Sequence, residues 1–348
     1  MFTLTRRLGV VAITVALVAG VSACSSSSDS GSSDDASGDK SIILITPTAV
    51  GSNNFLKLAV EGAEAAGKAN DATVDIYESK DPASIQQNID EAVRAAPDVI
   101  IGVSFSVLDQ VTAAAADNPD QEFLLIDTSA EKPTDNLTAA VFKEYEANYL
   151  IGVEAGLLTE SDSIGAIGAL DTPFIHRWID PFFAGATSVN PEVRTTQQYV
   201  GGDNPFGDQA RAKAQAQIIA DSGADYVNAA ASAGNLGVFE AAAAGSFKAF
   251  GVDSNQCLES PGNVVDNSIK RVDIAVENAV KDIFAGNGGG FKSYGLAEGG
   301  VGVTGLEDDV ASSKCLIAEH PDVIEKVAEV RDQIVSGEIT VEDPLTAG

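Results

Sequence analysis

A regular alternation of short β-branched runs with longer alanine-rich stretches constrains the fold more than any other feature of this sequence. The longer stretches place apolar residues at helical spacing, whereas the short runs have the length and composition of buried strands. Such alternation is typical of βαβ units wound around a parallel sheet. The predicted strands form a first group at residues 41–47, 73–79, 97–103, 122–127 and 137–142 and a second group at 163–170, 194–202, 225–231 and 247–253.

Two groups of strands imply two α/β lobes of Rossmann-like construction. About 308 residues follow the N-terminal segments, which is more than one hydrophobic core usually supports. We predict that lobe 1 contains residues 41–142 and about 254–290, and that lobe 2 contains residues 143–253 and about 291–348. In this assignment residues 264–286 return to the first lobe, because a chain that crosses repeatedly between lobes suits a hinge.

The N-terminus has the layout of a lipoprotein signal. Arg6 and Arg7 precede an apolar stretch at 8–21, which is shorter than the roughly 20 residues that span a bilayer. It ends in Val21-Ser22-Ala23-Cys24, a lipobox, so we expect cleavage after residue 23 and a diacylglycerol on Cys24. Two acyl chains anchor a protein stably, which places it on the outer face of the cell membrane. The alternative is an ordinary signal peptidase site with an incidental cysteine.

Composition bounds the rest of the chain. Residues 24–40 are rich in serine, glycine and aspartate, as in a flexible tether. The net charge of −30 becomes −32 once Arg6 and Arg7 leave with the signal, which argues against a nucleic-acid partner. With Cys24 lipidated, Cys257 and Cys315 remain as an even pair in an oxidising compartment, so we predict a disulfide, with two buried thiols as the alternative.

Ligands of open α/β sheets bind beyond the carboxyl ends of the strands, so the loops there are the candidate site. After the first predicted strand, Ser52, Asn53 and Asn54 lead into a helix whose first turn carries Phe55. An aromatic ring beside three polar side chains is typical of a stacking site for a planar ligand. The alternative for the serine and asparagines is a helix N-cap.

Later loops repeat this pattern. Phe105 follows the third strand and Asp127 the fourth, where Asp127 could equally cap a turn. Asp253 ends a strand of the second group and precedes the polar residues 254–256, a combination that favours contact with a polyol or sugar. Gly234 lies at a helix start, where bare backbone N–H groups can meet a ligand oxygen, although tight packing explains such a glycine as well.

Motifs for catalysis and for cofactors are missing from the sequence. It contains no G-x-S-x-G, H-E-x-x-H or G-x-x-x-x-G-K-[ST], and residues 164–170 lack the first Gly-x-Gly of a dinucleotide fingerprint. His176 and His320 are too few and too far apart to indicate a metal site. We therefore predict a binding protein without cofactor or metal, and keep an extracytoplasmic enzyme on a Rossmann-like scaffold as an alternative.

Several ordered motifs resemble the basic membrane protein family, substrate-binding lipoproteins of ABC importers that include a purine nucleoside receptor. The motifs occupy residues 102–127, 141–156, 182–191, 248–256, 268–276 and 295–304. The resemblance covers about residues 41–339 and implies a type I periplasmic-binding-protein fold, with two Rossmann-like lobes closing on a ligand at a hinge. It implies delivery of a nucleoside to an ABC permease by a protein that we expect to be a monomer. A sensor lipoprotein, or a sugar or flavin ligand, is the alternative.

Family members that bind nucleosides clamp the base on aromatic residues and hold the ribose with an aspartate and a lysine. By motif, the aromatic corresponds to Phe55 and the carboxylate that ends the fourth strand to Asp127. The sugar-binding pair corresponds to Asp253 and Lys270, which the resemblance makes partners. This chain has Ser52 and Leu56 where the family has Asp and Asn, and Asn228 where it often has an aromatic residue.

Overall fold

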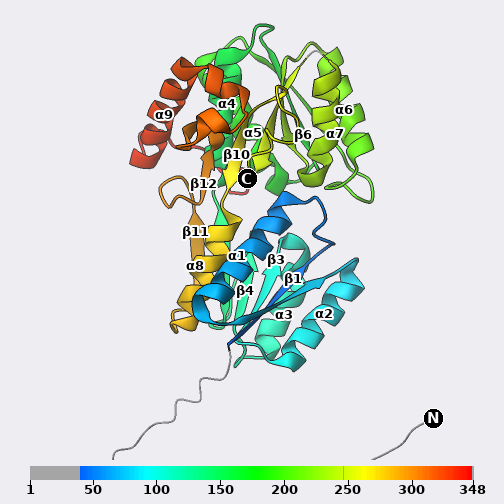
Figure 1. Cartoon of the computed structure of the whole chain (residues 1–348), viewed down its shortest axis with the longest axis vertical. Coiled ribbons are helices and arrows are strands. Elements are labelled where there is room, and N and C mark those ends of the chain that lie inside the picture. The colour runs from blue at the N-terminus through cyan, green and yellow to red at the C-terminus, as the bar shows by residue number, and fades with distance from the viewer. Residues whose placement is uncertain (1–39, 246, 347–348) are drawn as a thin grey trace, which may run out of the picture. The chain divides into compact units, whose positions relative to one another are not determined.

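Residues 40–245 and 247–346 are described by the computed structural model of the chain. Cys24 and the predicted signal peptide lie outside the described residues. The described part contains two six-stranded sheets, each with helices on both faces (Figure 1). The two α/β lobes that the alternation of strands and helices predicted are therefore confirmed.

The sheet of lobe 1 is entirely parallel. Its strands, in spatial order, are β11 (Gly290–Tyr294), β5 (Leu137–Phe142), β4 (Phe123–Ile126), β3 (Val99–Val103), β1 (Ser41–Thr46) and β2 (Thr73–Glu78). The central strands β3 and β4 are buried at every position. Burial on both faces explains why these strands read as continuous apolar runs rather than as alternating patterns.

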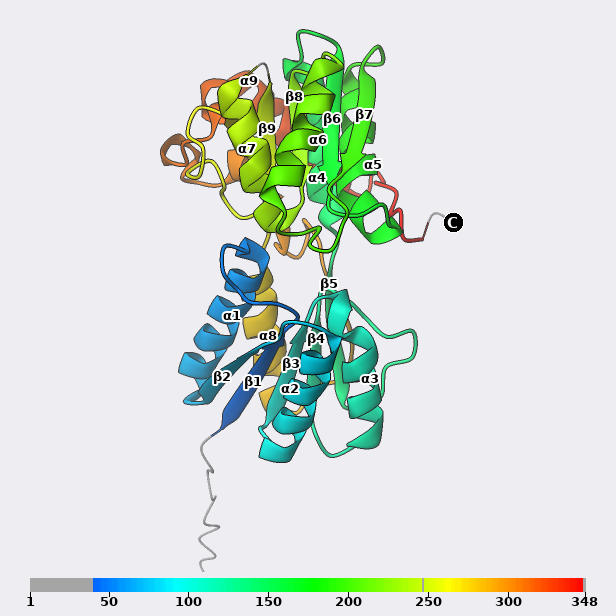
Figure 2. The ribbon, with the colours of Figure 1, turned by 90° about the vertical axis from the view of Figure 1, so that its right-hand side faces the viewer.

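Two helices cover each face of this sheet (Figure 2). Ile42 and Leu44 pack toward α1 (Asn54–Asn70) and α8 (Val272–Phe284). The alternate residues Ile43 and Ile45 pack toward the other pair of helices, which are α2 (Pro82–Ala95) and α3 (Leu108–Asp117), the latter preceded by the 3₁₀ turn η1 (Phe105–Val107). The period of two along β1 therefore divides its side chains between two apolar layers.

The sheet of lobe 2 repeats this order, and only its edge strand β12 is antiparallel. Its strands are β12 (Val301–Val303), β10 (Val264–Lys270), β9 (Lys248–Asp253), β8 (Tyr226–Ala230), β6 (Ser163–Gly168) and β7 (Arg194–Tyr199). Its helices are α4 (Glu144–Leu158), α5 (Pro173–Val189), α6 (Gln209–Asp221), α7 (Asn235–Ala244) and α9 (Pro321–Ser336). The 3₁₀ turns η2 (Ser232–Gly234), η3 (Thr304–Leu306), η4 (Val310–Ser312) and η5 (Leu316–Glu319) join some of them.

Helices α4 and α5 pack unusually closely because glycines lie at their contact. A Cβ atom added at Gly152 of α4 would lie 2.1 Å from the carbonyl oxygen of Phe182 in α5. No side chain fits at that distance, so α4 and α5 meet backbone to backbone. Of this close pair, α5 lines the ligand cavity.

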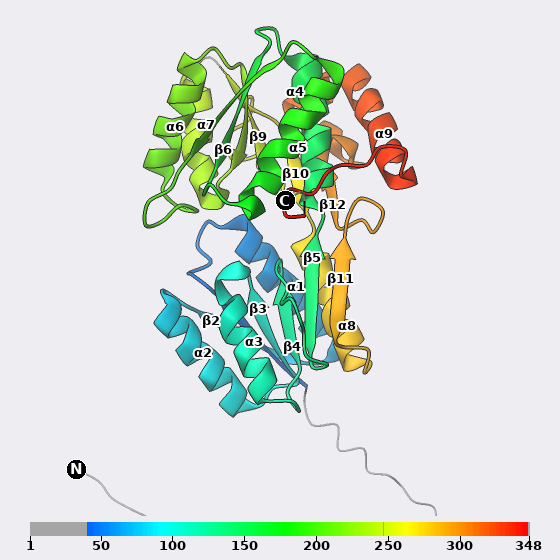
Figure 3. The ribbon, with the colours of Figure 1, turned by 180° about the vertical axis from the view of Figure 1, so that it is seen from behind.

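The predicted lobe boundaries were wrong in the second half of the chain. Residues 264–270 form β10 of lobe 2, and only α8 returns to lobe 1, where it packs against α1. β11 then completes the sheet of lobe 1 beside β5, although residues 291–348 were predicted for lobe 2. The chain therefore crosses between lobes three times, at residue 143, at residue 271 and between β11 and β12 (Figure 3).

β10 was not predicted as a strand of lobe 2 because it contains polar residues. Asp266 and Asn267 are fully buried, a position that is rare for such residues without partners. Their partners come from distant segments: Gly305 N donates to Asp266 Oδ2 at 2.8 Å, and Asn267 Nδ2 donates to Thr304 Oγ1 at 3.1 Å. No local pattern could show that these side chains would be satisfied inside a sheet.

The first and second crossings are each hydrogen-bonded to the third, the connection from β11 to β12. Lys143 N donates to Tyr294 O at 2.9 Å, and Arg271 N donates to Gly300 O at 2.9 Å. These bonds tie neighbouring connections together at the junction of the lobes. This junction, where three chain segments cross between the lobes, is the location at which the family resemblance implies a hinge.

The predicted disulfide is confirmed. Cys257 and Cys315 are bonded in lobe 2, with a Cα–Cα distance of 5.1 Å and a sequence separation of 58 residues. Cys257 follows β9, and Cys315 precedes η5, so the bond holds the loop after β9 against the C-terminal part of the chain. Within residues 40–245 and 247–346, no helix combines the length and apolarity that crossing a bilayer requires.

Candidate ligand-binding site

A cavity of about 480 Å³ lies between the lobes at the carboxyl ends of their strands. This volume is within the usual range for a small-molecule site. Lobe 1 lines it with the loop between β1 and α1 and with the turns after β3 and β4; lobe 2 lines it with α5 and with the turns after β7, β8 and β9. Lys270, at the end of β10, also reaches it.

The loop between β1 and α1 is held in place by its own hydrogen bonds. Val50 N donates to Glu78 Oε1 at 2.9 Å, and Leu56 N donates to Asn53 Oδ1 at 3.2 Å, so Asn53 caps α1. Ser52, Asn53 and Phe55 all line the cavity. Asn53 therefore has both the structural role and the location that the sequence offered as alternatives.

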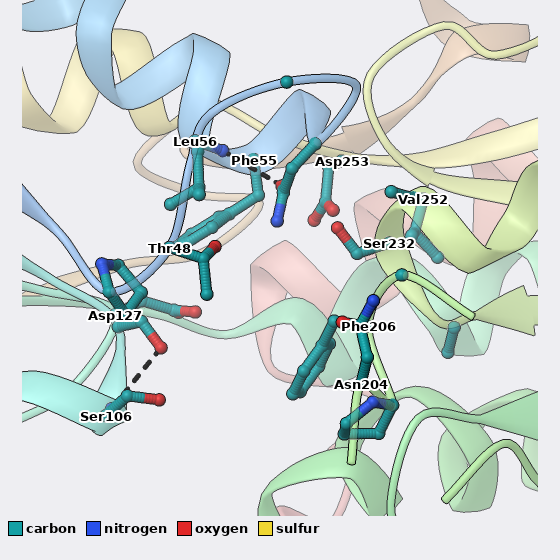
Figure 4. A pocket seen from close by; sticks show the side chains of 18 of the residues that line it. Thr48, Phe55, Leu56, Ser106, Asp127, Asn204, Phe206, Ser232, Val252 and Asp253 are labelled. Atoms are coloured by element: carbon teal, nitrogen blue, oxygen red, sulfur yellow. Dashed lines mark hydrogen bonds between the residues drawn. The ribbon is translucent and has the colours of Figure 1, made fainter. Parts of the chain in front are cut away.

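Aromatic rings from both lobes surround the cavity. Phe55 and Phe206 approach it from opposite sides (Figure 4). Phe105 of lobe 1 contacts two rings of lobe 2, with centroids 5.4 Å from Phe174 and 6.2 Å from Phe206. Trp178 packs edge-on against Phe174 at 5.3 Å. Five aromatic side chains thus provide an apolar, flat-sided wall suited to a planar ring.

Three of these rings escaped the sequence analysis. Phe174 and Trp178 lie four residues apart in α5, a spacing that puts both on one helix face but is equally typical of a core helix. Phe206 lies in the loop between β7 and α6, in a segment without an aromatic pattern. Only the folded arrangement shows that all three turn toward the cavity.

Four residues at equivalent strand ends of the two lobes have left-handed backbone conformations. Ser104 (φ 81°) and Asp127 (φ 67°) follow β3 and β4, whereas Ser232 (φ 52°) follows β8 and Asp253 (φ 70°) ends β9. All four line the cavity. Such conformations cost side-chain-bearing residues free energy and gather at binding sites, so this repeated strain supports the cavity as the functional site.

Lys270 links the lobes through a buried ion pair. Its Nζ lies 2.6 Å from Asp127 Oδ1 across the lobe junction, and both side chains are more than nine-tenths buried. The ammonium also lies 4.7 Å from the Trp178 ring centroid and 5.3 Å from that of Phe55. Burial alone would lower the pKa of Lys270, but the carboxylates of Asp127 and its neighbours outweigh burial and raise it, so the lysine stays charged.

The predicted pairing of Lys270 was therefore wrong in one respect. The family resemblance made Asp253 its partner, whereas the hydrogen bond goes to Asp127. Lys270 ends a strand and is 2% exposed, so it is a buried residue of the lobe junction rather than a solvated one. Asp253 remains close enough to influence the pKa of Lys270.

Asp253 is the carboxylate best placed to accept a ligand hydroxyl. It is 7% exposed, lines the cavity, and its side chain accepts no hydrogen bond from another described residue. Burial raises its pKa to about 6, although Lys270 opposes the shift. A buried carboxylate without donors is costly, and a ligand that supplies donors removes that cost.

This raised pKa predicts a pH dependence of binding. If ligand hydroxyls donate to the Asp253 carboxylate, affinity is full above about pH 6 and falls up to about tenfold per pH unit below it. The same group stabilises the empty protein as the pH falls, because its folded pKa lies above the unfolded value, so this loss is not caused by unfolding. Calorimetry between about pH 8 and pH 5 measures it. The control Asp253→Asn is expected to give a weak, flat profile, and a flat wild-type profile would contradict the assignment.

Three predicted ligand residues do not line the cavity. Asn54 Nδ2 instead donates to Glu259 Oε1 at 2.9 Å, a contact between the lobes. Asn228 is fully buried in β8, where its Nδ2 donates to Trp178 O at 2.9 Å and so supports the aromatic wall from behind. Gly234 is buried in η2 beside Ala231 and packs there, as the alternative to ligand contact supposed.

Comparisons with known proteins agree with this architecture. Residues 40–343 match the family described as ABC transporter substrate-binding protein PnrA-like. A CD4+ T-cell-stimulating antigen of Listeria innocua is 31% identical over 97% of this chain and 98% of its own length. An ABC transporter nucleoside-binding protein, BmpA, of Lactococcus lactis is 30% identical over 97% and 98%. A solute-binding protein of Aeropyrum pernix has the same fold, with a TM-score of 0.77, 24% identity, and coverage of 88% and 94%.

Two α/β lobes joined by three crossings, with an aromatic-lined cavity between them, have the periplasmic-binding-protein fold, and the family match makes this chain a solute-binding protein. The chain belongs to the Bmp family of PnrA-like ABC transporter substrate-binding proteins. The family consists of solute-binding proteins rather than enzymes, so the enzyme alternative is set aside.

Proposed function

We propose that this protein captures a nucleoside in the cavity between its lobes and delivers it to the permease of an ABC importer. The observation that carries the proposal is the pairing of an aromatic wall with Asp253, a buried carboxylate, within one cavity of about 480 Å³. A nucleoside has a flat base and a hydroxyl-rich ribose, which match these two halves. The name of the Lactococcus lactis relative supports the same ligand class.

In the proposed complex the base lies against Phe55 and the rings of lobe 2, and the ribose points toward Asp253. Lys270 donates to a ribose oxygen while it keeps Asp127 as its counter-ion. Ser52 and Asn53 line the cavity from the loop between β1 and α1, where they can contact the edge of the base. Since Asp127 and Lys270 come from different lobes, ligand contact with this pair favours the closed state.

Phe55→Ala tests the stacking contact. Base stacking on an aromatic side chain is worth about 1 to 3 kcal/mol in single-strand binding sites, so affinity is expected to fall about tenfold to a hundredfold. Calorimetry on wild type and variant measures the change. Phe291→Ala is the control, because Phe291 is an exposed ring outside the cavity. Equal affinity of Phe55→Ala and wild type would remove Phe55 from the site.

A thermal-shift screen tests the ligand class itself. Nucleosides, free nucleobases, hexoses, ribose and riboflavin are compared at equal concentration, since a ligand that binds only the folded state raises the midpoint by mass action. Nucleosides are expected to raise the melting midpoint most, because a free nucleobase or a free sugar contacts only the aromatic part or only the carboxylate part of the cavity. A larger shift with a hexose than with every nucleoside would contradict the proposal.

We also propose that the protein is exported as a monomer and held at the outer face of the membrane by a lipid on Cys24. The support is the lipobox at residues 21–24 and the polar tether that follows it. Cys24→Ala is expected to abolish incorporation of a labelled fatty acid and to leave the protein unprocessed or released. Cys24→Ala cells that still incorporate the label into this protein would contradict the proposal.

A further inference from the structure

Arg177 is a buried cation on α5, the helix that carries two rings of the aromatic wall. It lies between Phe174 and Trp178 in α5 and is 6% exposed. Its guanidinium stacks over the Tyr145 ring, with 5.0 Å from Cζ to the centroid. Because Arg177 points away from the ligand cavity while Phe174 and Trp178 line it, the contacts of its guanidinium fix the back of the wall.

Those contacts join two separate parts of the chain to α5. Arg177 Nη2 donates to Phe142 O at 2.8 Å, and Nη1 donates to Glu144 Oε1 at 2.9 Å, on either side of the first hinge crossing. Nε donates to Asp343 Oδ1 at 2.9 Å, and Nη2 also reaches Asp343 Oδ2 at 3.3 Å. The segment after α9, residues 337–346, is called the C-terminal tail. It thus supplies the bidentate partner of the guanidinium, and bidentate geometry fixes orientation as well as distance.

The tail also makes apolar contacts, since Ile339 and Val341 are partly buried and pack against the core of lobe 2. Beside these contacts lies a hollow of about 460 Å³, lined by Tyr149 of α4, by Asp180, Pro181 and Ala184 of α5, and by tail residues including Glu342. The ion pair between Asp343 and Arg177 is the specific attachment.

We propose that Asp343 is a positioning residue for the ligand cavity. Through Arg177 it fixes the position of Phe174 and Trp178 in α5 relative to the first crossing between the lobes. This inference rests on the proposed binding function. Without the Asp343 carboxylate, the buried guanidinium keeps only its bonds to Phe142 O and Glu144, and the first turns of α5 lose their ion pair with the tail. Phe174 and Trp178 then sample positions that do not fit the ligand.

Two matched substitutions in the tail test the proposal. Asp343→Asn removes the charge from the ion pair, and Glu342→Gln makes the same change one residue earlier, where the side chain makes no hydrogen bond within the described chain. Trp178 is the only tryptophan of the chain, and it lies in the wall, so its fluorescence reports on the wall directly. Acrylamide quenching requires no ligand, and affinity for the best nucleoside of the screen is measured beside it.

Asp343→Asn is expected to increase quenching of Trp178 and to weaken binding about three- to tenfold, part of the roughly tenfold to hundredfold that a charged hydrogen bond is worth. Arg177→Lys, which keeps the charge but loses the fork, is expected to do the same, and Glu342→Gln neither. Wild-type quenching in Asp343→Asn overturns the proposal, whatever its melting temperature. If no nucleoside binds the wild type, the proposed ligand fails while the quenching result still decides the role of Asp343.

Discussion

Replacing Lys270 by alanine is expected to lower the free energy of unfolding by about 3 to 5 kcal/mol, the usual cost of removing one partner from a buried ion pair. The variant leaves Asp127 buried without its counter-ion and removes the ammonium from the centre of four aromatic rings. It also removes the only ion pair that joins the two lobes beside the cavity among the described residues. Ligand binding is therefore expected to be lost together with stability.

Urea denaturation of Lys270→Ala and wild type measures the stability change. Lys326→Ala is the control, because Lys326 forms an exposed pair with Glu329 at 3.0 Å, and such pairs contribute only about 0 to 1 kcal/mol. Similar small losses in both variants would mean that the Lys270 pair does not hold the lobes. Lys270→Met, which keeps the apolar length of the side chain, separates the lost charge from lost packing.

Removing the disulfide is expected to cost about 4 kcal/mol, because closing a loop of 58 residues restricts the unfolded chain by that amount in the chain-entropy estimate. Cys257 lies four residues after Asp253, so the bond also holds the turn that carries the candidate ligand carboxylate. Reduction of the folded protein is expected to lower the melting temperature and, to a smaller extent, the affinity for ligand.

Denaturation of the Cys257→Ala, Cys315→Ala double variant under oxidising conditions gives the stability change without a reductant. The matched check repeats the wild-type measurement with reductant present, which is expected to approach the double variant. A variant within about 0.5 kcal/mol of the oxidised wild type would show that the bond contributes nothing measurable to folding.

The strands and their ends were readable from the sequence because buried parallel strands leave a simple signal. All nine strands β1 to β9 were predicted, most of them as short apolar runs, whereas the edge strands β2 and β7 are more polar and more exposed. The residue types that follow the apolar runs pointed to Phe55, Asp127 and Asp253. The rule that ligands bind at the carboxyl ends of strands placed these residues together before any contact was known. At these three positions the local sequence pattern and the location in the fold indicate the same role.

Features that depend on distant partners could not be read in the same way. β10 carries buried polar residues whose hydrogen-bond partners lie more than 30 residues away, so its composition did not resemble a central strand. The choice of Asp127 rather than Asp253 as the partner of Lys270 depends on how the two lobes meet. The wall residues Phe174 and Trp178 could not be told from core residues until α5 was placed against the cavity.

Titration calorimetry with nucleosides on the chain from residue 25 decides whether the cavity binds a nucleoside. We expect saturable binding at one site per chain, about tenfold to a hundredfold weaker in Phe55→Ala, at least as weak in Asp253→Ala, and unchanged in Phe291→Ala. This expectation would be contradicted if no nucleoside gave saturable heat, or if a nucleoside bound both cavity variants as tightly as the wild type.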